Sequence, residues 1–331
     1  MSGSHPPYKS PTQSMKSSKS HFDSSKRLRL RDIARETIEA INNDYVIFGD
    51  VAQKRLRQSS DETAHSTMYF RPGSARLRWW QQGPPLAVTA YRHGRQSEVA
   101  VQIMKMSTLQ GAHFLYKEYP TAKIGVLNFA SATQPGGGFI NGASAQEESI
   151  ARSSTLYLSL QTLQARQFYA LHDKDNQGGY YSHAMIYSPS IAIFRDDDGK
   201  WLQPYYVSVV TSPAVNAGLV RKLRYRSRVE TENEILSVMR ERMGRILAVF
   251  ELEGIRHLVL GSFGTGVFQN EVGALARIWG ELLSAPGARF AHSFDTVVFA
   301  IPDNYTRQKF STGFRAAVDP PRKIWLWRGM L

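Results

Sequence analysis

The sequence places two glutamates side by side, directly after a glutamine, in Gln146-Glu147-Glu148. This triplet begins eight residues after the last glycine of the run Gly136-Gly137-Gly138, near the expected start of a helix. Successive helical residues point about 100° apart, so the two carboxylates cannot share one role. One can face a ligand while the other contacts a neighbouring group. Glutamates near a helix N-terminus are also favourable with the helix dipole, so the pair alone would not indicate a site.

The three consecutive glycines change that interpretation. They lack side chains, so the backbone can approach a ligand closely and adopt positive φ. A carboxyl group in such a partly dehydrated place can have a raised pKa and act as an acid. Cleavage of a glycosidic bond needs an acid at the leaving oxygen and a means to activate water. The usual two flanking carboxylates are not evident, so we expect a single glutamate to do both jobs in turn.

A second glycine-rich loop runs from Gly261 to Phe268, with Gln269-Asn270 opening the next expected helix. Backbone amides in such a loop, aimed by a helix N-terminus, suit phosphate oxygens. The loop is not a P-loop, because no Gly-Lys-Ser/Thr follows. The pair Gly264 and Gly266 also lacks the third glycine of the dinucleotide-binding fingerprint. Two such loops on one sheet indicate a diphosphate held from both sides.

The elements that must position these residues follow a strand–helix rhythm after about residue 97. Strands alternating with helices of this length predict an α/β fold with helices on both faces of the sheet. Each glycine loop falls between the carboxyl end of a strand and the start of a helix, where ligands gather in such folds. The expected strands are 99–103, 124–129, 185–194, 205–210, 257–260 and 296–301, and the expected helices are 108–118, 143–163, 229–253 and 271–284.

The segments outside this core differ in composition. Residues 1–28 are mostly Ser, Lys, Pro, Gln and His, which predicts a disordered tail. From Arg31 onward apolar residues recur at three- and four-residue spacing, which predicts a helix. We therefore divide the chain into the tail, an N-terminal helical accessory region at 29–96, the α/β core at 97–310 and a C-terminal extension at 311–331.

The net charge of +13 and the isoelectric point of about 9.9 favour polyanionic partners such as nucleic acid, anionic membrane or polymeric phosphate. Part of this charge comes from a basic cluster formed by Lys26, Arg27, Arg29 and Arg31. Such a cluster can be a nuclear-import signal, a polyanion-binding surface or a solvated linker. The absence of cysteine excludes disulfides, thiolate metal sites and a cysteine nucleophile. No stretch approaches the ~18–20 apolar residues of a membrane span, and no secretory h-region is present. We expect an intracellular protein, nuclear or cytoplasmic.

The stretch from Asn128 to Phe139 and the later Gln146-Glu147-Glu148, with seven residues (139–145) between the triple glycine and Gln146, resemble the signature of the poly(ADP-ribose) glycohydrolases. In that family a triple glycine precedes Gln-Glu-Glu by a short gap. The resemblance runs from about residue 31 to 305. Further stretches that resemble the microbial-type branch are Tyr187-Ser188-Pro189, 194–197, 211–217 and 264–270.

The resemblance implies a macrodomain-like mixed sheet sandwiched between helices, with no metal and no cofactor. It implies hydrolysis of the ribose–ribose bond of poly(ADP-ribose), with ADP-ribose as product and ADP-ribosylated proteins as further partners. Glu148 would protonate the leaving oxygen and later take a proton from water. Glu147 would hold a ribose hydroxyl, and Gln146 would help to position the substrate.

The same resemblance implies two sets of binding residues. Gly136 to Phe139 would line the distal ribose and diphosphate, and the loop 262–268 would cradle the diphosphate, with Phe268 packing on a ribose. Microbial members often have cysteine where Thr265 stands, and animal-type members have aspartate where Asn128 stands, so Asn128 receives no catalytic role. The full set is Ser131, Gly136, Gly137, Gly138, Phe139, Gln146, Ser262, Phe263, Gly264, Thr265, Gly266, Val267 and Phe268.

Three other functions compete. A hydrolase that removes single ADP-ribose units would share the fold and the loops. A non-enzymatic reader of ADP-ribose would keep the loops but lack the acid, and Glu148 counts against it. A nucleic-acid-binding protein is motivated by the charge and by the run from Arg76 to Trp80, but the basic excess suits a diphosphate-rich polymer equally well.

Overall fold

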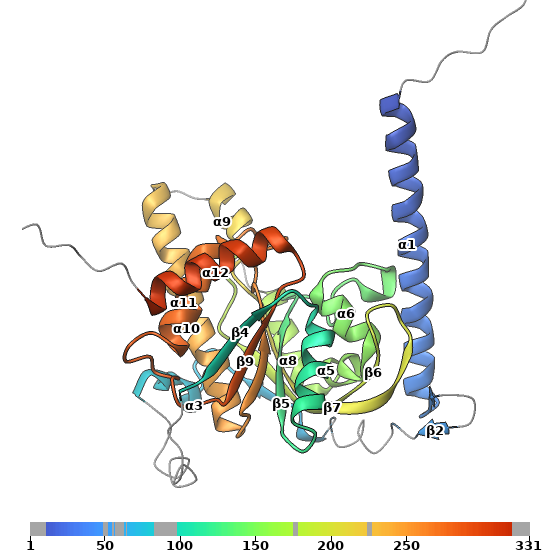
Figure 1. Ribbon diagram of the computed structural model, residues 1–331, viewed down its shortest axis with the longest axis horizontal. Helices are drawn as coiled ribbons and strands as arrows, with labels where there is room; N and C mark the ends of the chain where they lie inside the picture. Colours follow the sequence, from blue (N-terminus) through green and yellow to red (C-terminus); the bar gives the residue numbers. More distant parts are fainter. Residues whose placement is uncertain are drawn as a thin grey trace, which may run out of the picture.

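The computed structural model describes residues 11–48, 52–54, 56, 63, 65–82, 98–174, 178–223 and 227–319. For residues 11–23, 47, 48 and 52–54 it gives the backbone only. The described part is built around one large sheet with helices on both faces (Figure 1). No described helix is both long enough and apolar enough to cross a lipid bilayer.

The large sheet has seven strands in the order β3-β6-β7-β5-β8-β9-β4. Strands β7, β5, β8, β9 and β4 are mutually parallel, whereas β6 runs antiparallel to β7 and β3 antiparallel to β6. The mixed α/β fold predicted from the sequence is confirmed. The strand bounds are β3 Met68–Phe70, β4 Ala100–Met104, β5 Ile124–Phe129, β6 Met185–Arg195, β7 Trp201–Ser212, β8 His257–Leu260 and β9 Thr296–Ala300.

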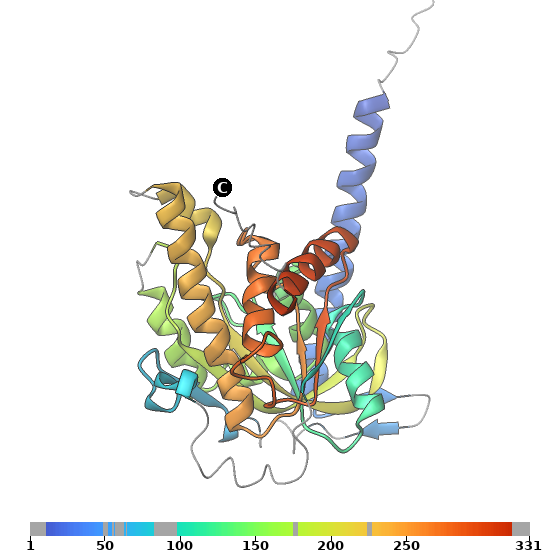
Figure 2. The ribbon, with the colours of Figure 1, turned by 60° about the vertical axis from the view of Figure 1, so that its left-hand side comes forward.

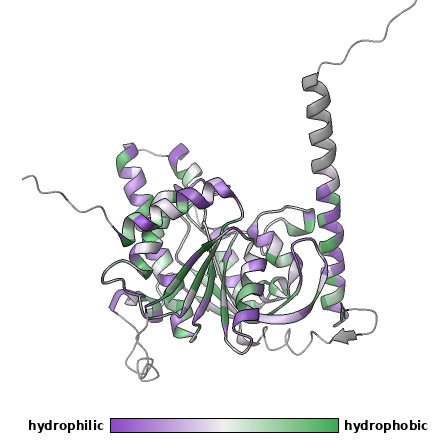
Figure 3. Ribbon diagram, viewed as in Figure 1, coloured by the Kyte–Doolittle hydropathy of each residue, from purple (hydrophilic) through white to green (hydrophobic). Residues whose placement is uncertain are grey.

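The central strands are buried on both faces, which explains their nearly continuous apolar sequences. In β5, Val126 packs into the core on one face and Leu127 into the core on the other. In β9, Val297 and Val298 divide between the two cores in the same way. Figure 3 shows these strands as the most hydrophobic part of the fold.

Two groups of helices cover the sheet. Helices α5 (Thr108–Glu118), α6 (Gln146–Ser153), α7 (Leu156–Leu160) and α8 (Leu163–Asp173) bury their apolar residues on one face. Helices α9 (Ala217–Leu223), α10 (Arg228–Leu252), α11 (Val272–Leu283) and α12 (Asn304–Val318) cover the other. Helix α12 was not predicted from the sequence, and it places residues 311–318 in the helical layer.

Helix α1 spans Pro11–Asn42 and projects well beyond the rest of the fold (Figures 1 and 2). Its C-terminal part docks through buried residues that include Ile33, Ala34 and Ile41. The helix begins earlier than the sequence predicted, since residues 11–28 were expected to be disordered. No proline or glycine occurs between residues 12 and 42, so a helix anchored at its docked end can propagate backward without a break.

The region between α1 and the core is not wholly helical. Strands β1 (Val46–Phe48) and β2 (Ala52–Lys54) form a small antiparallel pair, and β3 joins the large sheet. Short helices α3 (Ala75–Arg78) and η1 (Trp80–Gln82) pack on α10. Trp80 is buried, donates its indole N–H to Glu241 at 2.9 Å and stacks on a phenylalanine ring. Its ring is therefore not available to stack on a base.

The helix expected over 143–163 is divided into α6 and α7. Ser154 between them is extended, with φ −152° and ψ 174°, and forms an isolated bridge with Ile193 of β6. The Ser154 hydroxyl donates to the Ile150 carbonyl at 2.7 Å and accepts from the Leu156 N–H at 3.2 Å. These bonds stabilise the break between α6 and α7. The spacing of apolar residues does not indicate such a break, so it was not predicted.

Candidate active site

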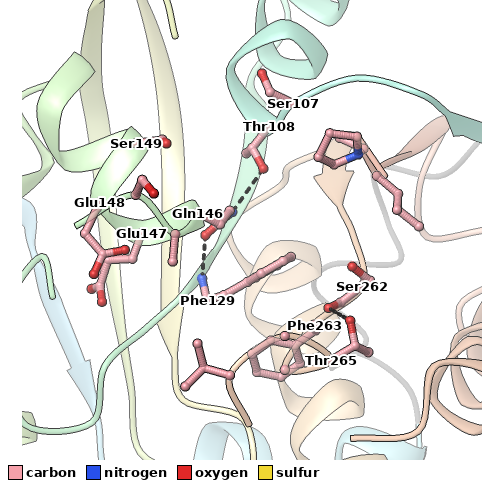
Figure 4. Close-up of a pocket in the computed structure, with 18 of the residues that line it drawn as sticks. Ser107, Thr108, Phe129, Gln146, Glu147, Glu148, Ser149, Ser262, Phe263 and Thr265 are labelled. Atoms are coloured by element: carbon pink, nitrogen blue, oxygen red, sulfur yellow. Dashed lines mark hydrogen bonds between the residues drawn. The ribbon is translucent and has the colours of Figure 1, made fainter. Parts of the chain in front are cut away.

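A cavity of about 660 Å³ opens at the carboxyl ends of β5, β8 and β9. Its two walls come from the start of α6 on one side and from the loop after β8 on the other (Figure 4). The lining residues are 107–109, 129–131, 144–149, 262–268 and 300–303, with Asp197, Ala214 and Thr306.

Glu147 is held by protein groups on both carboxyl oxygens. The Asn128 amide donates to Oε1 at 3.1 Å, and the Ser131 backbone N–H donates to Oε2 at 2.6 Å. Only 3% of Glu147 is exposed. Burial raises its pKa to about 8, although the Ser131 and Asn128 hydrogen bonds oppose that rise and the neighbouring Glu148 charge adds to it. Asn128, for which no catalytic role was expected, thus positions Glu147.

Glu148 is held on one oxygen only. The Gly138 backbone N–H donates to Oε1 at 3.0 Å. Oε2 is buried and has no hydrogen-bond partner among the described residues. Glu148 also lines the cavity, so its carboxyl group is fixed through one oxygen while the other makes no hydrogen bond to a described residue.

Gly137 makes this arrangement possible. It has φ +59°, and a Cβ at this position would overlap Glu148 Oε1. Any larger residue would therefore be strained and would displace the carboxylate. Glycine is therefore required at position 137, behind the glutamates.

Gln146 makes its hydrogen bonds to the protein. Its Oε1 accepts from the Phe129 N–H at 2.9 Å, and its Nε2 donates to the Leu127 carbonyl at 2.7 Å and to Thr108 Oγ1 at 3.1 Å. These bonds join the start of α6 to β5 and α5. Gln146 lines the cavity, but its amide positions the glutamates that follow it.

The first glycine loop lies behind the glutamates, and its predicted contact with the distal ribose and diphosphate stays a prediction. None of the residues Gly136 to Phe139 is among the described lining residues. The Phe139 ring is fully buried, packs with Ala34 of α1 and Ala151 of α6, and lies 4.8 Å from the Tyr157 ring. A buried aromatic ring gains more from this core than from a wet cleft.

The second loop lines the cavity throughout, from Ser262 to Phe268, as the sequence predicted. Gly264 has φ +73°, and a Cβ there would overlap the Ala214 side chain. The Asn270 amide donates to the Gly264 carbonyl at 2.9 Å and holds the turn. Phe263 is fully buried, with its ring 5.5 Å from that of Phe129, so it forms the floor of the loop.

Two charged residues near the cavity had no role assigned from the sequence. Asp197 lines the cavity and accepts a hydrogen bond from Ser107 Oγ at 2.5 Å; burial raises its pKa, opposed by that bond. Arg152 is buried and donates to the Ala143 carbonyl; burial lowers its pKa, opposed by the charges of Glu148 and Asp197. Asp197 falls in a stretch of family resemblance, which was the available signal.

No group of three or more His, Asp or Glu side chains is arranged to hold a metal ion in the described part of the chain. The chemistry available in the cavity is that of the carboxyl groups of Glu147, Glu148, Asp197 and Asp303 and of a loop of backbone amides.

Residues 34–196 match the family described as microbial-type PARG, catalytic domain, where PARG is poly(ADP-ribose) glycohydrolase. A mutant PARG from Thermomonospora curvata is 33% identical, with a TM-score of 0.76 over 87% of this chain and 100% of that one. The chain belongs to the microbial-type poly(ADP-ribose) glycohydrolases. No curated protein sequence matches.

Two ligand-bound members of this family are also similar. The T. curvata PARG bound to the inhibitor ADP-HPD is 34% identical, with a TM-score of 0.74 over 86% of this chain and 99% of that one. The Deinococcus radiodurans PARG in complex with ADP-ribose is 34% identical, with a TM-score of 0.66 over 78% of this chain and 97% of that one. The family membership agrees with the fold and with the placement of the cavity.

Proposed function

We propose that this protein hydrolyses the ribose–ribose O-glycosidic bond of poly(ADP-ribose) and releases ADP-ribose, with Glu148 as acid and then base. The observation that carries the proposal is the carboxyl group of Glu148, a lining residue whose Oε1 is held by the Gly138 N–H and whose buried Oε2 has no partner among the described residues. Family membership supports the activity, and the relatives that hold ADP-ribose or ADP-HPD support the ligand class. Polymer and ADP-ribosylated proteins are the proposed partners.

The two walls of the cavity suit the two ends of such a ligand. The loop from Ser262 to Phe268 offers backbone N–H groups to the diphosphate, because anions favour clustered amide donors. The distal ribose then reaches the opposite wall, where Glu147 and Glu148 lie (Figure 4). A carboxyl oxygen can accept more than one hydrogen bond, so Glu147 can still bind a ribose hydroxyl.

The bond cleavage needs one carboxyl group used twice. The proton of Glu148 passes to the oxygen that leaves, and the carbon–oxygen bond breaks with its electron pair on that oxygen. The ribose ring oxygen shares the positive charge of the resulting oxocarbenium centre, and the Glu148 carboxylate stabilises it. Water then attacks this carbon and gives its proton to Glu148. The Gly138 N–H holds the carboxyl group in place for both transfers.

The competing functions differ at this acid. A protein that only binds ADP-ribose does not need a carboxyl group that is held through one oxygen and leaves the other unpartnered. The geometry of Glu148 therefore favours an enzyme. A hydrolase of single ADP-ribose units would use the same residues, and only the substrate separates it from the proposed function.

The test measures free ADP-ribose released from auto-modified poly(ADP-ribose) polymerase by the wild type, Glu148→Gln and the exposed control Glu118→Gln. We expect the wild type and the control to release ADP-ribose, and Glu148→Gln to lose about 10³-fold in kcat. Calorimetry should show that all three still bind ADP-ribose.

Three results would contradict the proposal. A wild type that binds ADP-ribose but releases none is a reader. A wild type that leaves the polymer intact but releases ADP-ribose from mono-ADP-ribosylated protein is the competing hydrolase. If Glu148→Gln keeps its kcat, the acid lies elsewhere.

A further inference from the structure

The exposed face of α1 carries four basic residues that we call the α1 basic rim, namely Lys26, Arg27, Arg29 and Arg31. All four are exposed, and none pairs with a carboxylate among the described residues. By contrast, Arg35, one turn further on, pairs with Asp32 at 3.1 Å. The rim is therefore an uncompensated patch of positive charge.

The rim lies against the segments that form one wall of the cavity. Arg27 donates its Nε–H to the Asn141 carbonyl at 2.9 Å, just before the lining residues that begin at Ser144. Arg29 donates to the Asp198 carbonyl at 3.0 Å, directly after the lining residue Asp197. The docking bonds use backbone carbonyls, so the charges of both guanidinium groups remain available.

The position of the rim matters because of the direction in which the polymer would leave the cavity. With the diphosphate of the bound unit at the second glycine loop and its distal ribose at Glu148, the scissile bond points toward the α6 wall. The next ADP-ribose unit then leaves the cavity on the side of α6 and α1, which lie next to each other (Figure 1). Each further unit carries a diphosphate with two negative charges.

We propose that the α1 basic rim binds the diphosphates of the polymer beyond the scissile bond. This inference rests on the proposed function, and it makes α1 part of the substrate-binding surface. The neighbouring sequence has the same sign of charge, since residues 11–31 contain six basic residues and one acidic residue, Asp23. A polyanion that passes the rim releases condensed counterions at each neutralised phosphate.

The test variant is Lys26→Glu/Arg31→Glu, because Arg27 and Arg29 also dock the helix. The matched control is Arg166→Glu/Lys174→Glu, which makes the same charge change at exposed positions on and just after α8, a helix that contributes no lining residue. Initial rates are measured on long polymer and on two-unit polymer at several salt concentrations.

We expect the rim variant to raise KM for long polymer about tenfold. The slope of log KM against log salt concentration should fall by about 1 to 2, because fewer counterions are released on binding. Its kcat and its affinity for ADP-ribose should change much less, and its KM for two-unit polymer, which has one diphosphate beyond the scissile bond, should rise less than that for long polymer. The control should match the wild type. Unchanged KM, or an equal rise in the control, overturns the proposal.

Binding without turnover separates this proposal from the proposed function. If the wild type releases no ADP-ribose, fluorescence polarisation of labelled long polymer decides the role of the rim by itself. Weaker polymer binding by the rim variant than by the control supports it. The wild type could instead bind duplex DNA more tightly than polymer. If the rim variant then loses DNA binding and the control keeps it, the surface binds nucleic acid and the proposal is wrong.

Discussion

The two glycine-rich loops follow neighbouring parallel strands, β5 and β8, yet they do different work. The first folds behind the glutamates, where the Gly138 N–H binds Glu148 and the Phe139 ring is buried. The second lies open along the cavity wall, and Val267 is 83% exposed. Glycine content therefore does not by itself identify a ligand-contacting loop.

The largest effect that separates the two loops is expected from Gly137→Ala. The new Cβ would overlap Glu148 Oε1, and φ +59° disfavours any residue with a Cβ. We expect kcat on the polymer to fall about 10²-fold, with ADP-ribose affinity nearly unchanged. Steady-state kinetics and calorimetry check this result. A loss of affinity with intact kcat would make the first loop a cradle like the second.

The carboxyl group behind the first loop predicts a pH dependence. Burial raises the pKa of Glu147 from 4.5 to about 8. The stabilisation from its protonated form is fully present below pH 4.5 and is lost as the pH rises through about 8. Between those values the free energy of unfolding of the wild type should fall by about 1.4 kcal/mol per pH unit relative to Glu147→Gln. Urea denaturation at several pH values measures this difference, and parallel curves would refute it.

Gly264→Ala should act on binding instead of turnover. The added Cβ would overlap the Ala214 side chain and approach the Asn270 amide to 2.9 Å, so the second loop must shift. We expect Kd for ADP-ribose to rise roughly tenfold and kcat to change little. Calorimetric titration gives Kd directly. A fall in kcat alone would mean that this loop also positions the acid.

The smallest effect is expected from Gly266→Ala, which serves as the control for the other two glycine variants. No atom lies within 4 Å of a Cβ added at Gly266. We expect Kd and kcat to stay within about twofold of the wild type, since surface substitutions of this kind usually change little. A tenfold change in Kd would show that the bound ligand itself fills this space.

Much of the fold could be predicted because the central strands are buried on both faces, and this burial is visible in the sequence as short, largely apolar segments. Ile124–Phe129 and Thr296–Ala300 are largely apolar runs, and the expected strand bounds agree to within one residue. The place of the second glycine loop, between a strand and a helix, could be predicted because these elements follow in order, whereas its binding of a diphosphate remains a prediction. The catalytic roles of Glu147 and Glu148 remain predictions.

What the sequence could not give depends on contacts between distant segments. Phe139 belongs to a core formed with α1, about a hundred residues earlier, so nothing local marks it as buried. Gln146 is a polar residue beside a predicted site, and only the structure shows that its amide binds β5 and α5. The start of α1 was also missed, because the composition of residues 11–28 predicts disorder while the docked half of the helix lies beyond them.

Val267 stands at the mouth of the cavity in a chain that contains no cysteine. The substitution Val267→Cys would therefore introduce a sole thiol, exposed beside the bound ligand. A maleimide fluorophore or a spin label would react there without competition from any other sulfhydryl. The open rim of the second loop thus becomes a single addressable point, from which spectroscopy can follow the arrival and departure of ligand in real time.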